Sequence, residues 1–184
     1  TVKELRQHGE IMDLLHLPRS PFAKINIHVG GAYGDRSAAL NRFIDNFSHL
    51  PAAASTRLTV ENDDKASMFS VTDLCTIHEA VGIPIVFDYH HHLFRSGDLT
   101  AKEALSLAYD TWPKSITPIV HVSSSRKRFE DPHASDTAHA DFVYEPINCY
   151  GMDVDVMLEA KGKEQATLRY LKEIGFGENK RITP

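Results

Sequence analysis

The sequence predicts an α/β fold in which helices cover a parallel sheet. Two observations indicate this: five short, β-branched apolar runs recur along the 184 residues, and segments with apolar residues at helical spacing lie between them. Each apolar run becomes polar at its C-terminal end, and such runs are typical of parallel strands buried on both faces. Regular alternation of strands and helices favours βα units joined into one sheet.

The five expected strands cover residues 23–30, 57–63, 84–90, 118–124 and 153–161. Between them we find no internal repeat, low-complexity stretch or domain linker, so residues 1–184 are expected to form a single domain. A chain of 184 residues that is 42% hydrophobic can build one domain with its own core. It is short for a complete eight-stranded (β/α)₈ barrel, which typically needs about 250 residues.

Helices are expected wherever apolar residues recur at intervals of three or four. The opening segment 1–15 is amphipathic in this way. The later apolar faces are Leu40, Phe43, Phe47 and Leu50; Leu74, Ile77 and Val81, capped by Ser70 or Thr72; Ala104, Leu105, Ala108 and Trp112, behind Thr100; and Leu168, Leu171 and Ile174, ended by Gly175 and Gly177. Residues 123–139 form the longest irregular stretch, and long loops in compact domains are often functional.

Composition narrows the class of protein. No apolar run is long enough to span a membrane, and the first residues resemble an amphipathic helix and not a signal peptide. Cys75 and Cys149 lack any zinc or redox spacing, which suits a reducing cytoplasm. The formal net charge of −5 argues mildly against a free-standing nucleic-acid binder. Divalent cations bound by a cluster of carboxylates would reverse the sign of the local charge, so the net charge alone does not exclude nucleic-acid binding.

Every expected strand ends in a residue that can bind a metal ion. These residues are His28, Glu61, Asp88, His121 and Glu159. Parallel α/β folds build their sites at the carboxyl ends of the strands, so we expect these side chains to share one rim. A set of imidazoles and carboxylates without thiolates suits Mn²⁺, Zn²⁺ or Fe²⁺. Bridging carboxylates can hold two ions, which together promote attack on a phosphodiester.

Each of these residues also has an ordinary structural interpretation. A single histidine is more often a surface or core residue than a ligand, and Glu61 or Asp88 alone could cap the following helix. The run His90, His91 and His92 could be a solvated loop. The joint pattern, with a potential ligand after every strand, favours a shared metal site. Further histidines follow the third strand and lie in the long loop 123–139, and of these His90, His92 and His133 are the weakest candidate ligands.

The blocks NIHVGG (26–31), LTVEND (58–63), VFDYHHH (86–92), HVSSS (121–125), HADFV (139–143) and DVMLEAKGKE (154–163) resemble bacterial UV-damage endonucleases in order and spacing. The resemblance covers nearly the whole chain. It implies a TIM (β/α)₈ barrel with up to three metal ions, usually Mn²⁺ with Zn²⁺ possible. It also implies an enzyme that nicks damaged double-stranded DNA immediately 5′ to UV photoproducts.

The resemblance also implies roles for individual residues. Glu61, Asp88, His121 and Glu159 resemble the ligands of a central ion, and the three carboxylates are the candidate catalytic residues. Glu61 would bridge to a second ion held by His28, whereas His91 and His139 resemble the ligands of a third. Ile119 stands where the family can carry a modified lysine, so a third ion would be weakly held. The match begins at the fourth barrel strand, and we therefore expect about the last five strand–helix units of a barrel.

Five basic residues are candidate phosphate contacts, although they could equally be ordinary surface charges: Arg36, Arg126, Lys127, Arg128 and Lys161. Two other functions stay open. One is a related metalloenzyme on the same plan, either an abasic-site endonuclease or a sugar isomerase. The other is a metal-binding fragment without activity. A partial barrel would be an open, curved sheet that is inactive alone and associates through its free edges.

Overall fold

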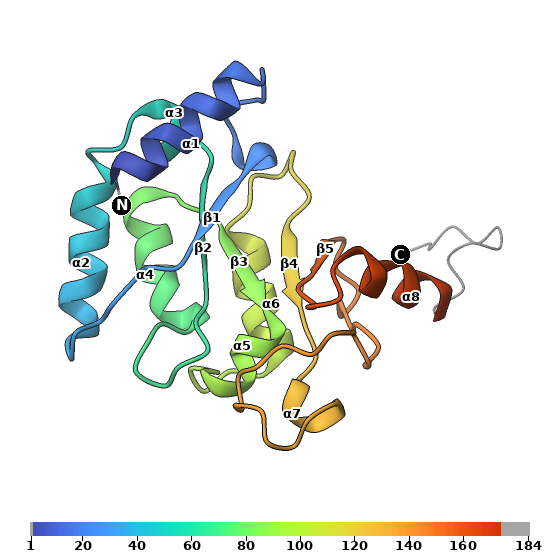
Figure 1. The fold of residues 1–184 in the computed structure, drawn as a ribbon. Coiled ribbons are helices and arrows are strands. Elements are labelled where there is room, and N and C mark those ends of the chain that lie inside the picture. Colours follow the sequence, from blue (N-terminus) through green and yellow to red (C-terminus); the bar gives the residue numbers. More distant parts are fainter. Residues whose placement is uncertain (1, 174–184) are drawn as a thin grey trace.

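A computed structural model describes residues 2–173 as five parallel strands that curl into a half-barrel (Figure 1). The strands are β1 (Ile25–Ile27), β2 (Leu58–Glu61), β3 (Ile85–Asp88), β4 (Ile119–Val122) and β5 (Asp155–Leu158), and their order in the sheet follows the sequence. Each predicted strand is present, which confirms the partial-barrel fold. Each is also shorter than the run that predicted it, because the polar ends of the runs belong to the loops at the rim.

Helices connect the strands, and all five predicted helical segments are present. They are α1 (Val2–Leu14), α2 (Arg36–Phe47), α4 (Val71–Val81), α6 (Ala101–Asp110) and α8 (Glu164–Glu173). Leu50 and Trp112 lie just beyond the ends of α2 and α6. Ile174, Gly175 and Gly177 fall outside the described residues. No helix in the described part of the chain is long and apolar enough to cross a membrane.

Capping fixes where two of these helices begin. Ser70, and not Thr72, caps α4, and its side chain forms a reciprocal capping box with Asp73. Thr100 and Glu103 form the same arrangement at the start of α6. Gly82 ends α4 with a φ of 73°, a left-handed conformation that favours glycine. These caps set the lengths of the two helices that pack behind β3.

Four short helical turns have no counterpart in the sequence prediction: η1 (Pro21–Ala23), α3 (Ala52–Ser55), α5 (Tyr89–Phe94) and α7 (Arg126–Phe129). The most consequential is α5, because it contains the histidine run. His90, His91 and His92 are all buried, so interpreting the run as a solvated loop is wrong. Asp88 caps α5 by accepting a hydrogen bond from the His91 amide at 2.7 Å. Oδ1 of Asp88 thus caps α5, whereas Oδ2 forms no hydrogen bond.

The core lies between the sheet and its covering helices. Strand residues Val60, Ile85 and Phe87 pack there with Leu74 of α4 and Leu105 of α6. All of these side chains are at most 1% exposed. The β2–β3 region is therefore the rigid centre of the molecule, and the ends of these two strands are held firmly in place.

Arg57 joins the amino-terminal helix to the sheet from a fully buried position. Its guanidinium donates to the carbonyls of Leu17, Pro18 and Ala53, and it forms an ion pair with Asp13 at 2.8 Å. A lysine keeps the charge but lacks the planar fork of donors that satisfies these carbonyls. Buried acceptors left without donors are costly.

We expect Arg57→Lys to lower the free energy of unfolding by about 2 kcal/mol, measured by urea denaturation. Arg19→Lys is the matched control, because Arg19 binds the same Asp13 carboxylate but is exposed. Its change should stay within about 0.5 kcal/mol. Equal effects of the two substitutions would show that the ion pair with Asp13 matters and the buried carbonyls do not.

Candidate metal centre

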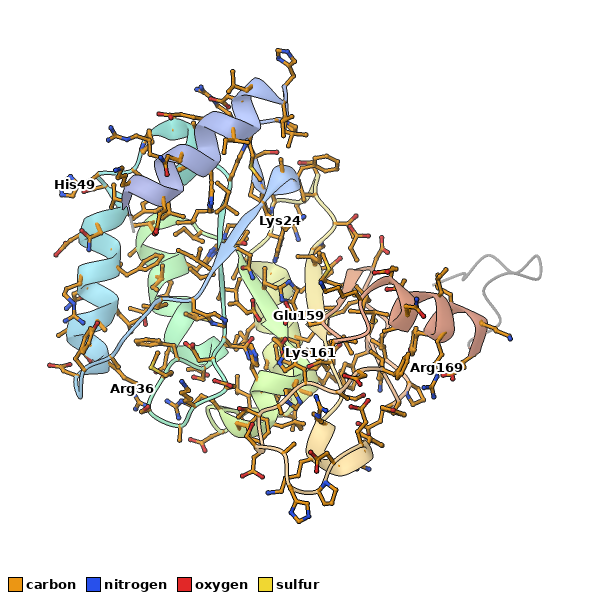
Figure 2. All side chains as sticks on the ribbon, viewed as in Figure 1. Lys24, Arg36, His49, Glu159, Lys161 and Arg169 are labelled. Carbon is orange, nitrogen blue, oxygen red and sulfur yellow. The ribbon has the colours of Figure 1, made fainter. Side chains whose placement is uncertain are left out.

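The strand ends bring four of the predicted ligands together at the carboxyl end of the sheet. Asp88 and His121 are direct partners in the β3–β4 register, and Glu61 is the last residue of β2. Glu159 follows β5, where its amide donates to the Val122 carbonyl at 2.9 Å. Figure 2 shows Glu159 near the middle of the molecule, beside Lys161. Residues up to about a hundred positions apart in the sequence thus meet because parallel strands end at one rim.

These four residues form a compact cluster of potential ligand atoms. One donor atom from each of Glu61, Asp88, His121 and Glu159 lies within 4.8 Å of all the others. His121 Nδ1 is 3.2 Å from Glu61 Oε2 and 3.1 Å from Glu159 Oε1. The spacing suits a single ion bound by oxygen and nitrogen atoms, the set that Mn²⁺ and Zn²⁺ accept.

A second cluster shares Glu61 and adds His28 and His91, again with ligand atoms within 4.8 Å of one another. The His91 Nδ1 atom is 3.3 Å from Glu61 Oε1, and the rings of His28 and His91 are 5.5 Å apart. Glu61 therefore directs one carboxylate oxygen at each cluster. A carboxylate in this position would be able to contact an ion in either cluster.

His139, in the long loop after β4, lies beside both clusters but belongs to neither. Its ring is 5.8 Å from the ring of His91, and its Nδ1 is 3.9 Å from Glu159 Oε2. His91 thus faces His28 and Glu61 on one side and His139 on the other. Ile119, at the first position of β4, offers no donor atom. His133 is exposed in the same long loop.

Hydrogen bonds at Nδ1 orient three of the histidines. His91 Nδ1 is 2.9 Å from the Asn62 carbonyl, and His139 Nδ1 is 3.0 Å from the Glu159 carbonyl. A carbonyl only accepts, so each of these nitrogens must donate, which leaves the lone pair on Nε2. His28 Nδ1 faces the Asp63 carboxylate at 3.2 Å in the same manner. Metal-binding histidines are commonly fixed by such a partner on the second nitrogen.

Three residues that the sequence prediction missed support the clusters. Asn26 donates to Glu61 Oε2 at 2.5 Å and accepts from Thr59 at 2.9 Å. The Asn62 side chain bonds both the amide and the carbonyl of Asp88. Asp63 holds His28. The sequence does place these polar residues at the ends of apolar strands, where they need hydrogen-bond partners. It does not indicate which partner each of them contacts.

Burial and charge act in opposite directions on the cluster. Burial raises the pKa of Asp88 to about 6. Burial also disfavours ionised Glu61, but His121 and His91 outweigh it and hold the pKa of this carboxyl well below its ordinary value. His121 is likewise opposed by burial, yet Glu159 and Glu61 raise its pKa to about 10. The cluster is therefore rich in carboxylate charge that protons on the imidazoles compensate.

Three buried atoms of the cluster form no hydrogen bond: Glu61 Oε1, Asp88 Oδ2 and His121 Nδ1. Glu61 Oε1 and His121 Nδ1 have neighbours of opposite charge at 3.1 to 3.3 Å, but without hydrogen-bond geometry. Unsatisfied buried polar atoms are rare and costly, and here they converge from three adjacent strands. A divalent cation would satisfy all three. The residues present therefore fit a metal ion with mixed oxygen and nitrogen ligands.

The candidate phosphate contacts fall into two groups. The three basic residues of α7 are each paired with a carboxylate: Arg126 with Asp141, Lys127 with Asp136 and Arg128 with Glu145. Arg36 and Lys161, both labelled in Figure 2, have no carboxylate of residues 2–173 within ion-pair distance. Their charges are therefore more available to a polyanion than those of α7.

Comparison with known proteins identifies the family of the chain. The family model described as UV-endonuclease UvdE matches residues 1–184. A UV DNA damage endonuclease of Bacillus pumilus is 38% identical over 98% of this chain and 57% of its own length. One of Bacillus cereus is 33% identical over 94% of this chain and 55% of its own length.

The crystal structure of SacUVDE superimposes with a TM-score of 0.78 at 34% identity, covering 95% of this chain and 58% of that one. The chain thus spans a little over half the length of the relatives it matches. The half-barrel, the rim of ligands and these matches lead to the same conclusion: the chain belongs to the UV-endonuclease UvdE family.

Proposed function

We propose that this chain is the metal-binding part of a DNA repair endonuclease that nicks the backbone 5′ to UV photoproducts. The observation that carries the proposal is the cluster of Glu61, Asp88, His121 and Glu159, whose potential ligand atoms lie within 4.8 Å of one another. Buried atoms of the first three form no hydrogen bond. Family membership supports a DNA repair endonuclease. The metal requirement and the position of the nick are the parts that experiment must test.

In this proposal the four residues would hold a central ion, and Glu61 would also serve a second ion together with His28. Mn²⁺ is the expected metal, with Zn²⁺ as the alternative. Divalent cations at such sites lower the pKa of bound water and offset the charge of the phosphodiester oxygens. His91 and His139 are available to a third ion, which would have few anionic ligands because Ile119 supplies none.

The chain's own residues have distinct tasks. Asp88 is completely buried and serves as a fixed anion, whereas the side chain of Glu159 is about one third exposed and lies where substrate can reach it. Asn26 fixes the Glu61 carboxylate, so little reorganisation is needed when substrate arrives. Lys161, two residues after Glu159, is placed to contact a phosphate of damaged double-stranded DNA.

The test uses the full-length protein and end-labelled duplexes that carry a single UV photoproduct. We expect Mn²⁺-dependent nicking immediately 5′ to the lesion, abolished by EDTA and restored by added Mn²⁺. Undamaged duplex and an abasic-site duplex serve as comparison substrates. Nicking that survives EDTA would contradict the metal requirement. Cleavage of the abasic duplex alone would favour an abasic-site endonuclease.

Asp63 provides a separate test of the second ion. Asp63→Asn keeps a side-chain oxygen near His28 Nδ1 but removes the negative charge that strengthens the imidazole as a ligand. We expect about 10-fold weaker binding of one Mn²⁺ ion, followed by the electron paramagnetic resonance signal of free Mn²⁺. Asp64→Asn, at the adjacent position, should leave binding unchanged. Unaltered affinity in Asp63→Asn would argue against a metal bound through His28.

A further inference from the structure

The loop between β1 and α2 presents an aromatic ring that the proposed metal centre does not use. It begins at His28 and ends where Arg36 starts α2, so it extends from the end of the sheet that carries the metal ligands (Figures 1 and 2). Tyr33, within this loop, is 90% exposed. Among the large apolar and aromatic residues of the described chain it is the most exposed.

The backbone of this loop has an unfavourable conformation at Tyr33. Tyr33 has a φ of 49°, in the left-handed region that favours glycine. The flanking Gly30 and Gly34 have φ values of 98° and 84°, so the loop already uses glycine on both sides. A tyrosine in this conformation gains nothing from burial, since almost all of its surface faces solvent. The stability of the fold therefore does not explain why position 33 is a tyrosine.

The ring of Tyr33 is nevertheless held in place. It lies against Gly31, where an added Cβ would come within 2.8 Å of a ring atom. The guanidinium of Arg42, on α2, lies 5.8 Å from the ring centre and also donates to the Gly31 carbonyl at 3.4 Å. The contacts with Gly31 and Arg42 thus restrict the ring while leaving most of it exposed, which lowers the entropy lost when it binds a partner.

The surroundings of the ring indicate the chemistry of that partner. An open groove of about 700 Å³ runs past Tyr33 and is lined by residues 31–37 with Ser67 and Met68. Arg36 and Asp35 both line this groove, and Arg42 lies on the other side of the loop, where it lines the groove alongside β1 with Tyr33. Both arginines are exposed, and neither forms an ion pair with a carboxylate of residues 2–173. An exposed ring with two exposed arginines near it, neither in an ion pair, matches a single nucleic-acid strand, whose bases stack and whose phosphates are anionic.

We propose that Tyr33 stacks on an unstacked nucleobase of the substrate DNA, while Arg36 in the groove and Arg42 beside the ring bind neighbouring phosphates. This inference rests on the proposed function, because it assumes that the strand continues from the metal centre across the same rim. Tyr33 is then a substrate-binding residue that takes no part in the chemical step. Stacking requires the ring and not the hydroxyl.

The experiment measures the affinity of the full-length protein for a fluorescein-labelled duplex with one photoproduct and for an undamaged single strand. We expect Tyr33→Ala to weaken binding of both about 10-fold and to raise KM with kcat unchanged. Tyr33→Phe should behave as the unmodified protein. Gly31→Ala should weaken binding as well. The tyrosine is unchanged in this variant, but the added Cβ displaces its ring. Phe22→Ala is the control, since Phe22 is 68% exposed but precedes β1 at the opposite end of the sheet.

Unchanged affinity in Tyr33→Ala would overturn the inference. A melting temperature lowered by several degrees, with affinity unaffected, would also overturn it and would show that another segment of the longer protein covers the ring. The proposed function fails separately, if the unmodified protein does not nick the damaged duplex at all. Single-strand affinity can still be compared in that case, so the two failures are distinguishable.

Discussion

Glu61→Gln in the full-length protein is expected to lower the rate of nicking at UV photoproducts by at least about 100-fold. Glu61 is the residue that the two ligand clusters share, with one oxygen directed at each. Glutamine preserves the volume and the contact with Asn26 but removes the charge that would hold two cations close together. The loss should therefore appear in kcat and in Mn²⁺ affinity, and not in the fold.

Circular dichroism and the melting temperature without metal should stay near those of the unmodified protein. Glu79→Gln is the matched control, since Glu79 is an exposed glutamate on α4 far from the strand ends. Nicking by Glu61→Gln at a near-normal rate, with two Mn²⁺ ions still bound, would exclude the bridging role.

The strand ends could be predicted from sequence because the rule that places them is topological. Once Glu61, Asp88 and His121 are assigned to the ends of consecutive parallel strands, they must reach the same rim whatever the details of packing. The β3–β4 register then sets Asp88 directly beside His121. The predicted strand boundaries differ from the observed ones by a few residues, but this does not change the rim at which the three side chains lie.

The histidine run shows where such reasoning stops. His90, His91 and His92 look like a polar segment, but Asp88 caps a short helix there and all three rings are buried. His91 points to Glu61, His90 packs on His139 at 5.1 Å, and His92 packs on Phe87 at 5.2 Å. Sequence spacing cannot distinguish these directions, because each depends on tertiary partners that lie far away in the chain.

The polypeptide of residues 1–184, expressed alone, is expected to associate and to show no nicking of UV-damaged DNA. In the described sheet, β1 pairs only with β2 and β5 pairs only with β4, so each outer strand has a free backbone edge. Val156 and Met157 of β5 are 37% and 48% exposed. Alongside β1, an open groove of about 590 Å³ is lined largely by apolar side chains of α1, β1 and α2.

Exposed edges and apolar grooves of this kind favour contacts with further strands, either of the longer protein or of another copy. Light scattering after size exclusion should give masses above 20.6 kDa that rise with concentration. Activity should be absent even with Mn²⁺, because a half-barrel offers only part of the surface that positions a duplex over the metal centre. The full-length protein is the positive control. A stable monomer of these residues that nicks damaged DNA efficiently would show that the half-barrel carries lesion recognition as well as the metal ions.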